Sequence, residues 1–103
     1  MLVEDQMQEE IMEKKFASWL VDQGYRQYTP GGKPSTVYDY VKRIDFVCAE
    51  EKCTWMELAT IIEQIIPQYD AGGIKQALGN RSHRAVINAL KRFSEFVAGT
   101  RRR

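Results

Sequence analysis

Apolar residues recur three and four positions apart along most of this chain, and this spacing restricts what it can fold into. The clearest case lies near the carboxyl end, where one stripe consists of Val86, Ala89, Leu90, Phe93, Phe96 and Val97. Alternation of apolar and polar residues, the pattern of a half-buried strand, occurs nowhere in the sequence. We therefore predict an all-α fold.

Four amphipathic helices are predicted, with one short helical turn before the last. The first covers about residues 3–23 and stops at Gly24, and a loop rich in glycine and proline separates it from the second. Ser35 or Thr36 is expected to cap the second helix. Its apolar stripe consists of Val37, Tyr40, Val41, Ile44, Val47 and Cys48.

The third helix is predicted to start after Thr54, because Thr54 and Glu57 have the spacing of a capping box. Pro67 is expected to end this helix, since proline lacks the amide hydrogen that a helix needs. A single turn is expected near residues 74–78. The last helix is predicted to begin with Ser82 as its cap and to run to about Ala98.

A chain of 103 residues has the usual length of one domain. We predict a single compact helical domain over residues 1–98 and a basic tail over residues 99–103. Polar residues interrupt every apolar run well before the length that a membrane span needs, so no membrane partner is expected. The acidic start of the chain is the opposite of a targeting signal and favours a cytoplasmic location.

The chain offers little for metal chemistry or catalysis. Two cysteines, Cys48 and Cys53, and one histidine are too few for a structural zinc site, and no cofactor is expected. We interpret Cys48 as a small buried hydrophobe, with a redox pair as the alternative. Ser82 and His83 could suggest a nucleophile and its base, but adjacent helix residues point about 100° apart. The carboxylates are interpreted as solvated helix faces, so we do not expect an enzyme.

Charge is segregated along the chain although its formal total is only +1. Residues 1–23 carry six acids and two bases, and residues 48–70 carry five acids and one base. Residues 24–47 carry four bases and two acids, and residues 71–103 carry eight bases and one acid. Such segregation produces a directional electric field at the protein surface.

The two basic segments hold the candidate nucleic-acid ligands. On the last helix Arg84, Asn88 and Lys91 are spaced i, i+4 and i+7, opposite the apolar stripe, and are predicted to form one polar ridge. A ridge of this kind suits the major groove of DNA. The remaining candidates lie beside it or around the second helix: Arg81, Arg92, Lys33, Lys42 and Arg43. A basic face that only improves solubility is the alternative.

Three features each have two interpretations. Phe46, opposite the second helix's stripe, either packs under the connection that follows it or contacts a partner. The tail Arg101-Arg102-Arg103 either binds phosphates or is a free end. Surplus apolar residues on the first helix form either a fraying end or a self-association surface: Leu2, Val3, Met7 and Ile11.

Several motifs occur in a familiar order. They are Phe16-Ala17-Ser18-Trp19-Leu20, then Gly24, then Pro34-Ser35-Thr36-Val37-Tyr38-Asp39-Tyr40, and finally Gly79-Asn80-Arg81-Ser82 leading to Ala89-Leu90-Lys91-Arg92-Phe93-Ser94-Glu95-Phe96-Val97. This order resembles the N-terminal core-binding domain of tyrosine recombinases (phage integrases), over roughly residues 12–98. The resemblance implies a four-helix domain whose second and fourth helices lie against DNA. The DNA contacts that it implies here are Lys42, Arg43, Arg84, Asn88 and Lys91.

In that family a catalytic domain follows, whereas this chain ends at Arg103, so strand cleavage is not expected. We therefore expect a stand-alone, non-catalytic module from a bacterium or a mobile genetic element that binds double-stranded DNA. The alternative is a small regulator or inhibitor that binds a nucleic-acid enzyme or a nucleoprotein complex.

Overall fold

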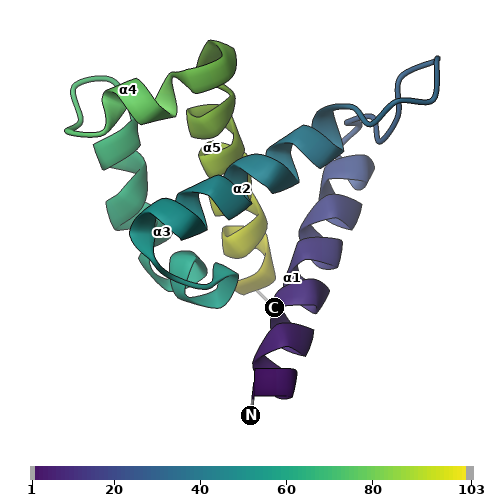
Figure 1. The fold of residues 1–103 in the computed structure, drawn as a ribbon, viewed down its shortest axis with the longest axis horizontal. Coiled ribbons are helices and arrows are strands. Elements are labelled where there is room, and N and C mark those ends of the chain that lie inside the picture. Colours follow the sequence, from purple (N-terminus) through teal and green to yellow (C-terminus); the bar gives the residue numbers. More distant parts are fainter. Residues whose placement is uncertain (1, 102–103) are drawn as a thin grey trace.

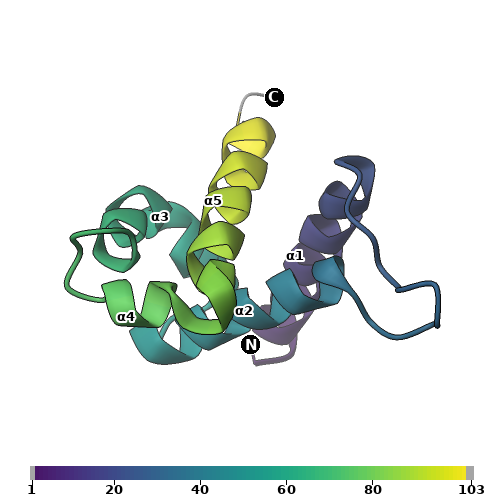
Figure 2. The same ribbon diagram turned by 90° about the horizontal axis from the view of Figure 1, so that it is seen from above.

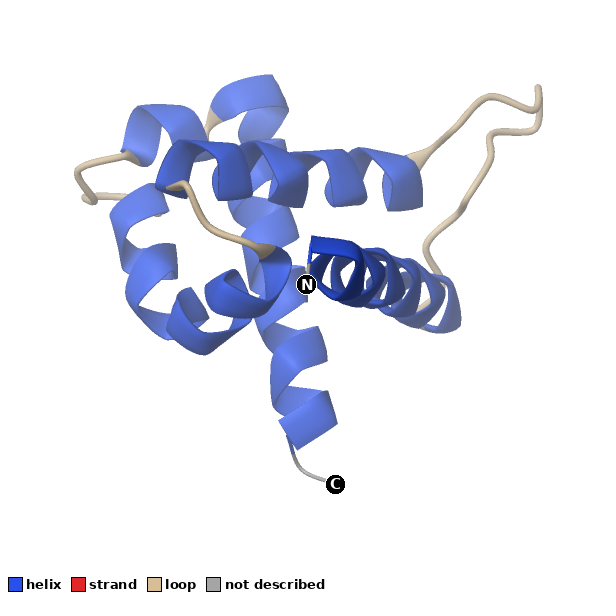
Figure 3. Cartoon of the chain, turned by 60° about the horizontal axis from the view of Figure 1, so that its bottom comes forward, coloured by secondary structure: helices blue, strands red, loops and turns tan. Residues whose placement is uncertain are grey.

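Five helices and no strand make up the part of the chain that the structure describes (Figure 3). The structure is a computed structural model, which describes the backbone of residues 2–101 and the side chains of residues 8–100. The helices are α1 (Leu2–Asp22), α2 (Thr36–Glu51), α3 (Trp55–Tyr69), α4 (Gln76–Gly79) and α5 (Arg81–Arg101). The predicted all-α fold, with four longer helices and one short helical turn, is confirmed.

Helix α5 has the central place in this arrangement. In Figure 1, α2 crosses in front of α5, and α1 lies to one side with its amino-terminal end reaching below the other helices. Seen from above, α3 and α4 lie on one side of α5 and α1 on the other, while α2 runs along the lower side of the view from α4 toward α1 (Figure 2). The loop between α1 and α2 extends away from the helices (Figure 3).

The core contains a cluster of aromatic rings where α1, α3 and α5 meet. The centroid of the Phe16 ring lies 5.3 Å from that of Phe93, 5.5 Å from that of Phe96 and 5.9 Å from that of Trp55. The predicted stripes supply most of the remaining buried residues, among them Cys48, which is buried as expected. Burial of such a stripe, rather than helix propensity alone, is what holds each helix in place.

Two helix ends follow from local sequence. Gly24, with a φ of 99°, closes α1: its N–H donates to the carbonyl of Val21, and that of Tyr25 donates to Leu20. This is a Schellman motif, which requires a left-handed residue and favours glycine. The predicted capping box at α3 is confirmed, because the Glu57 N–H donates to Thr54 Oγ1 and the Thr54 N–H donates to Glu57 Oε1.

Other predicted helix ends were wrong. Pro67 does not end α3, which continues to Tyr69. Proline removes only one bond this close to a helix end, and the last turn is held by the burial of Tyr69 and by its hydroxyl, which donates to Glu51 Oε2 (2.7 Å). Helix α5 likewise continues to Arg101, beyond the predicted end at Ala98. The start of α2 is as predicted, with Ser35 in the cap position, although the Ser35 side chain makes no cap hydrogen bond.

The start of α5 also differs from the prediction. Ser82 does not cap a regular helix, because Ser82, His83 and Arg84 have φ angles of 53°, 58° and 67°. Non-glycine residues pay a steric cost in this left-handed region. Only Asn80 separates α4 from α5, and the left-handed residues lie in the first turn of α5, where the Arg84 N–H donates to the carbonyl of Asn80. Helical spacing therefore cannot be used to place Arg84.

Candidate nucleic-acid interface

Arg84 and Lys91 meet at a shared acid, Asp70, at the end of α3. Arg84 Nη2 lies 3.5 Å from Asp70 Oδ1, and Lys91 Nζ lies 3.3 Å from Asp70 Oδ2. We call these three residues the Asp70 cluster. The Ala71 N–H and Lys91 both bond to the Asp70 carboxylate, which lowers its pKa and keeps it ionised. The predicted ridge is thus partly neutralised, and only Asn88, which is exposed, lies outside this cluster.

A second basic site joins α2 to the start of α5. Arg43, Phe46, Arg81, Ser82 and Val86 line a hollow of about 190 Å³, which we call the basic hollow. The guanidinium carbon of Arg81 lies 5.0 Å from the centroid of the Phe46 ring, a cation–π contact. Phe46 is therefore half-buried, packed against the core with Arg81 over its ring. Arg43 Nη2 lies 3.1 Å from Asp39 Oδ1, which neutralises part of this charge.

The other candidate residues are dispersed. Lys42 is exposed on α2, with its Nζ 5.4 Å from the centroid of the Tyr38 ring. Lys33 lies in the projecting loop, where its N–H donates to Thr29 Oγ1. Arg92 pairs with Glu95 at 2.7 Å, and its Nη1 donates to the hydroxyl of Tyr25, which follows α1. Arg92 therefore has a structural role, which its sequence position did not indicate.

Several acids bond across helices instead of forming solvated faces, contrary to the prediction. Glu9 Oε1 accepts a hydrogen bond from the Trp55 N–H (2.8 Å), so a residue of α1 caps α3. Asp45 Oδ1 accepts one from Trp55 Nε1 (2.8 Å). Glu51 accepts from the Tyr69 hydroxyl and from Lys75. These acids therefore hold helices α1, α2 and α3 together.

The pKa of Glu13 is raised from 4.5 to about 7 by burial and by the neighbouring Asp45. The folded protein thus binds a proton at Glu13 more tightly than the unfolded chain does. The free energy of unfolding should therefore decrease as pH rises from about 4.5 to about 7, and remain at the lower value above that range.

Glu13→Gln is accordingly expected to remove this pH dependence. Because the side chain is only partly buried, we discount for solvent screening and expect a gain of about 1–2 kcal/mol at pH 8. Urea unfolding at pH 5 and pH 8 measures the effect. Glu63→Gln, an exposed carboxyl on α3, is the matched control. An equal response of both variants to pH would contradict the assignment to Glu13.

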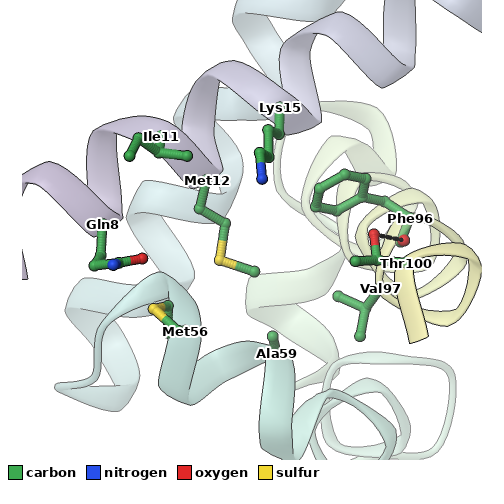
Figure 4. Close-up of a pocket in the computed structure, with 9 residues that line it drawn as sticks. All are labelled: Gln8, Ile11, Met12, Lys15, Met56, Ala59, Phe96, Val97 and Thr100. Atoms are coloured by element: carbon green, nitrogen blue, oxygen red, sulfur yellow. Dashed lines mark hydrogen bonds between the residues drawn. The ribbon is translucent and has the colours of Figure 1, made fainter. Parts of the chain in front are cut away.

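A third surface feature is apolar. Helices α1, α3 and α5 enclose a groove of about 250 Å³, in which Met12 points toward Met56 and Ala59 (Figure 4). Phe96 and Val97 close the groove from α5. Its polar lining is limited to Gln8, Lys15 and Thr100, and the Thr100 hydroxyl already donates to the Phe96 carbonyl. No motif in the sequence pointed to this groove, because three separate helices contribute to it.

Comparison with protein-family models, with curated proteins and with solved structures finds no match. Over residues 2–101, no helix combines the length and the apolar character needed to cross a membrane. The candidate functions therefore depend on the charges, contacts and exposed surfaces of the described residues.

Proposed function

We propose that this chain is a non-catalytic module that binds double-stranded DNA through α2 and the first turns of α5. The observation that carries this proposal is the convergence of arginines distant in sequence, Arg43 and Arg81, on one hollow. Arg84, a member of the Asp70 cluster, lies only three residues after Arg81 along the chain. A positively charged surface drawn from two helices is the electrostatic signature of nucleic-acid binding.

Each part of this surface suits a different contact. Arg81 and Lys42 are exposed and can approach phosphates directly, which supplies affinity without reading sequence. Arg84 and Asn88 are also exposed, and arginine and asparagine are the side chains that recognise guanine and adenine in the major groove. Asp39 and Asp70 oppose binding, because each places a carboxylate beside the cations that would meet phosphates.

Fluorescence anisotropy with a labelled mixed-sequence duplex tests the proposal. Displacement of counterions by several phosphate contacts makes affinity fall by about 10- to 1000-fold between roughly 50 and 200 mM salt. The proposed module should show a decrease of this size. Absence of binding at the lower salt concentration would refute the proposal.

Two substitutions should shift DNA affinity in opposite directions. Arg81→Glu is expected to weaken binding by about tenfold or more and to reduce the salt slope by about one. Asp70→Asn should strengthen binding by about three- to tenfold at low salt, because it frees Arg84 and Lys91 while keeping the oxygen that accepts the Ala71 N–H. The same anisotropy titrations measure both effects.

Lys14→Glu supplies the matched control for charge. Lys14 is exposed on α1 and belongs to neither the basic hollow nor the Asp70 cluster, and its substitution changes net charge as much as Arg81→Glu does. Its effect on affinity should be small. Equal losses from Lys14→Glu and Arg81→Glu would mean that only net charge matters, and the proposed surface would be wrong.

A regulator that binds a nucleic-acid enzyme or a nucleoprotein is the second candidate function. The observation that favours it is the apolar groove between α1, α3 and α5, since concave apolar surfaces accept helices of other proteins. Failure of DNA binding at low salt, combined with a one-to-one protein complex that Arg81→Glu leaves intact, would support this function over the first.

A further inference from the structure

The apolar groove borders two large apolar side chains that are about half exposed. Ile11 on α1 is 44% exposed and Met56 on α3 is 48% exposed, and both line the groove. Two of its other lining residues, Met12 and Ala59, continue the apolar surface between them (Figure 4). Burial of such a surface is favourable, and methionines adjust their shape to whatever covers them.

The groove is long enough for a helix. Beyond Lys15 it continues into a second hollow of about 410 Å³ between α1 and α5, lined by Lys15, Trp19, Asp22, Phe96 and Thr100 among others. The two hollows share Lys15, Phe96 and Thr100, so together they follow α1 from Gln8 to Asp22. At 1.5 Å per residue this distance is about 21 Å, or roughly four helical turns.

The charges of α1 indicate which helix would fit there. Residues 1–10 carry four acids and no base, whereas residues 11–22 carry two acids and two bases, and one of those bases, Lys15, lines the groove. A parallel pair of α1 helices would set acids against acids, but an antiparallel pair sets the acidic half of each beside Lys15 of the other. Antiparallel pairing across a two-fold axis is also the self-complementary geometry of most homodimers.

The position of α1 makes the same pairing accessible. Its amino-terminal end reaches beyond the body of the molecule, so it can extend over a neighbouring copy (Figure 1). We propose that two copies of this chain associate through the groove, with their α1 helices antiparallel and Ile11 and Met56 buried between them. This association requires no DNA and is independent of the proposed function. Of the surplus apolar residues on the first helix, only Ile11 is among the described side chains.

Sedimentation velocity of the full chain, from micromolar to millimolar concentration, tests the association. The expected result is a concentration-dependent shift from the 12.0 kDa monomer to twice that mass. Ile11→Glu and Met56→Glu should each raise the dissociation constant by about tenfold or more, because a charge would be buried in an apolar contact. Ile61→Glu is the matched control, since Ile61 is 37% exposed on α3 but does not line the groove.

Lys15→Glu tests the antiparallel orientation. It should weaken the dimer by roughly threefold to tenfold at low salt, because it sets a carboxylate against the acidic half of the second copy. Circular dichroism of each variant checks that the fold is intact. A protein that stays monomeric throughout, or a dimer indifferent to both Ile11→Glu and Met56→Glu, would overturn the proposal. A dimer strengthened by Lys15→Glu would overturn the antiparallel arrangement.

Discussion

Truncation of Phe16 to alanine is expected to lower the free energy of unfolding by about 3–5 kcal/mol. The Phe16 side chain is fully buried, and its ring lies within 6.2 Å of four other aromatic rings, measured between centroids. Those rings come from α1, α3 and α5, so the cavity would open where the three helices join. Small domains are stable by only about 5–15 kcal/mol, so Phe16→Ala should leave the protein close to unfolding.

Chemical denaturation followed by circular dichroism measures this effect. Phe16→Leu keeps most of the apolar volume and should cost less than half as much as Phe16→Ala. Tyr28→Ala provides a surface comparison, because Tyr28 is 61% exposed in the loop between α1 and α2, and its loss should be small. If Phe16→Ala cost no more than Tyr28→Ala, the aromatic cluster could not be the centre of the core.

The second large effect is expected at Gly79, the last residue of α4. A Cβ atom there would collide with the backbone carbonyl oxygen of Tyr69 and lie 2.9 Å from its carbonyl carbon. The obstacle is backbone at the end of α3 and cannot rotate away, so α4 would have to move. We expect Gly79→Ala to lower the free energy of unfolding by about 2–4 kcal/mol.

Gly99→Ala is the matched control for this substitution. Gly99 lies within α5, and a Cβ atom there meets nothing within 4 Å. Alanine is a better helix former than glycine, so Gly99→Ala should raise the free energy of unfolding by about 0.5–1 kcal/mol. Urea midpoints of the two variants should therefore move in opposite directions. Movement in the same direction would contradict the close approach of α4 to α3.

The candidate interface was only partly predictable from the sequence. The residue types were visible, and Arg81, Arg84 and Asn88 are exposed where a ligand could reach them. The ridge was derived from regular helical spacing, but Arg84 lies in a left-handed turn. Asp70, which pairs with Arg84 and Lys91, is 14 and 21 positions away from them, so no local pattern could reveal its contribution.

The sequence by itself determined the helices and those of their ends that depend on neighbouring residues. The apolar stripes, the capping box at Thr54 and the closure of α1 at Gly24 all involve residues at most five positions apart, and such interactions are visible as spacing. Only the tertiary structure decided that Glu9 caps α3, that α3 continues past Pro67, and that three helices form an apolar groove. Each of these depends on the path of the chain, because the atoms that meet belong to segments brought together only by burial of the core.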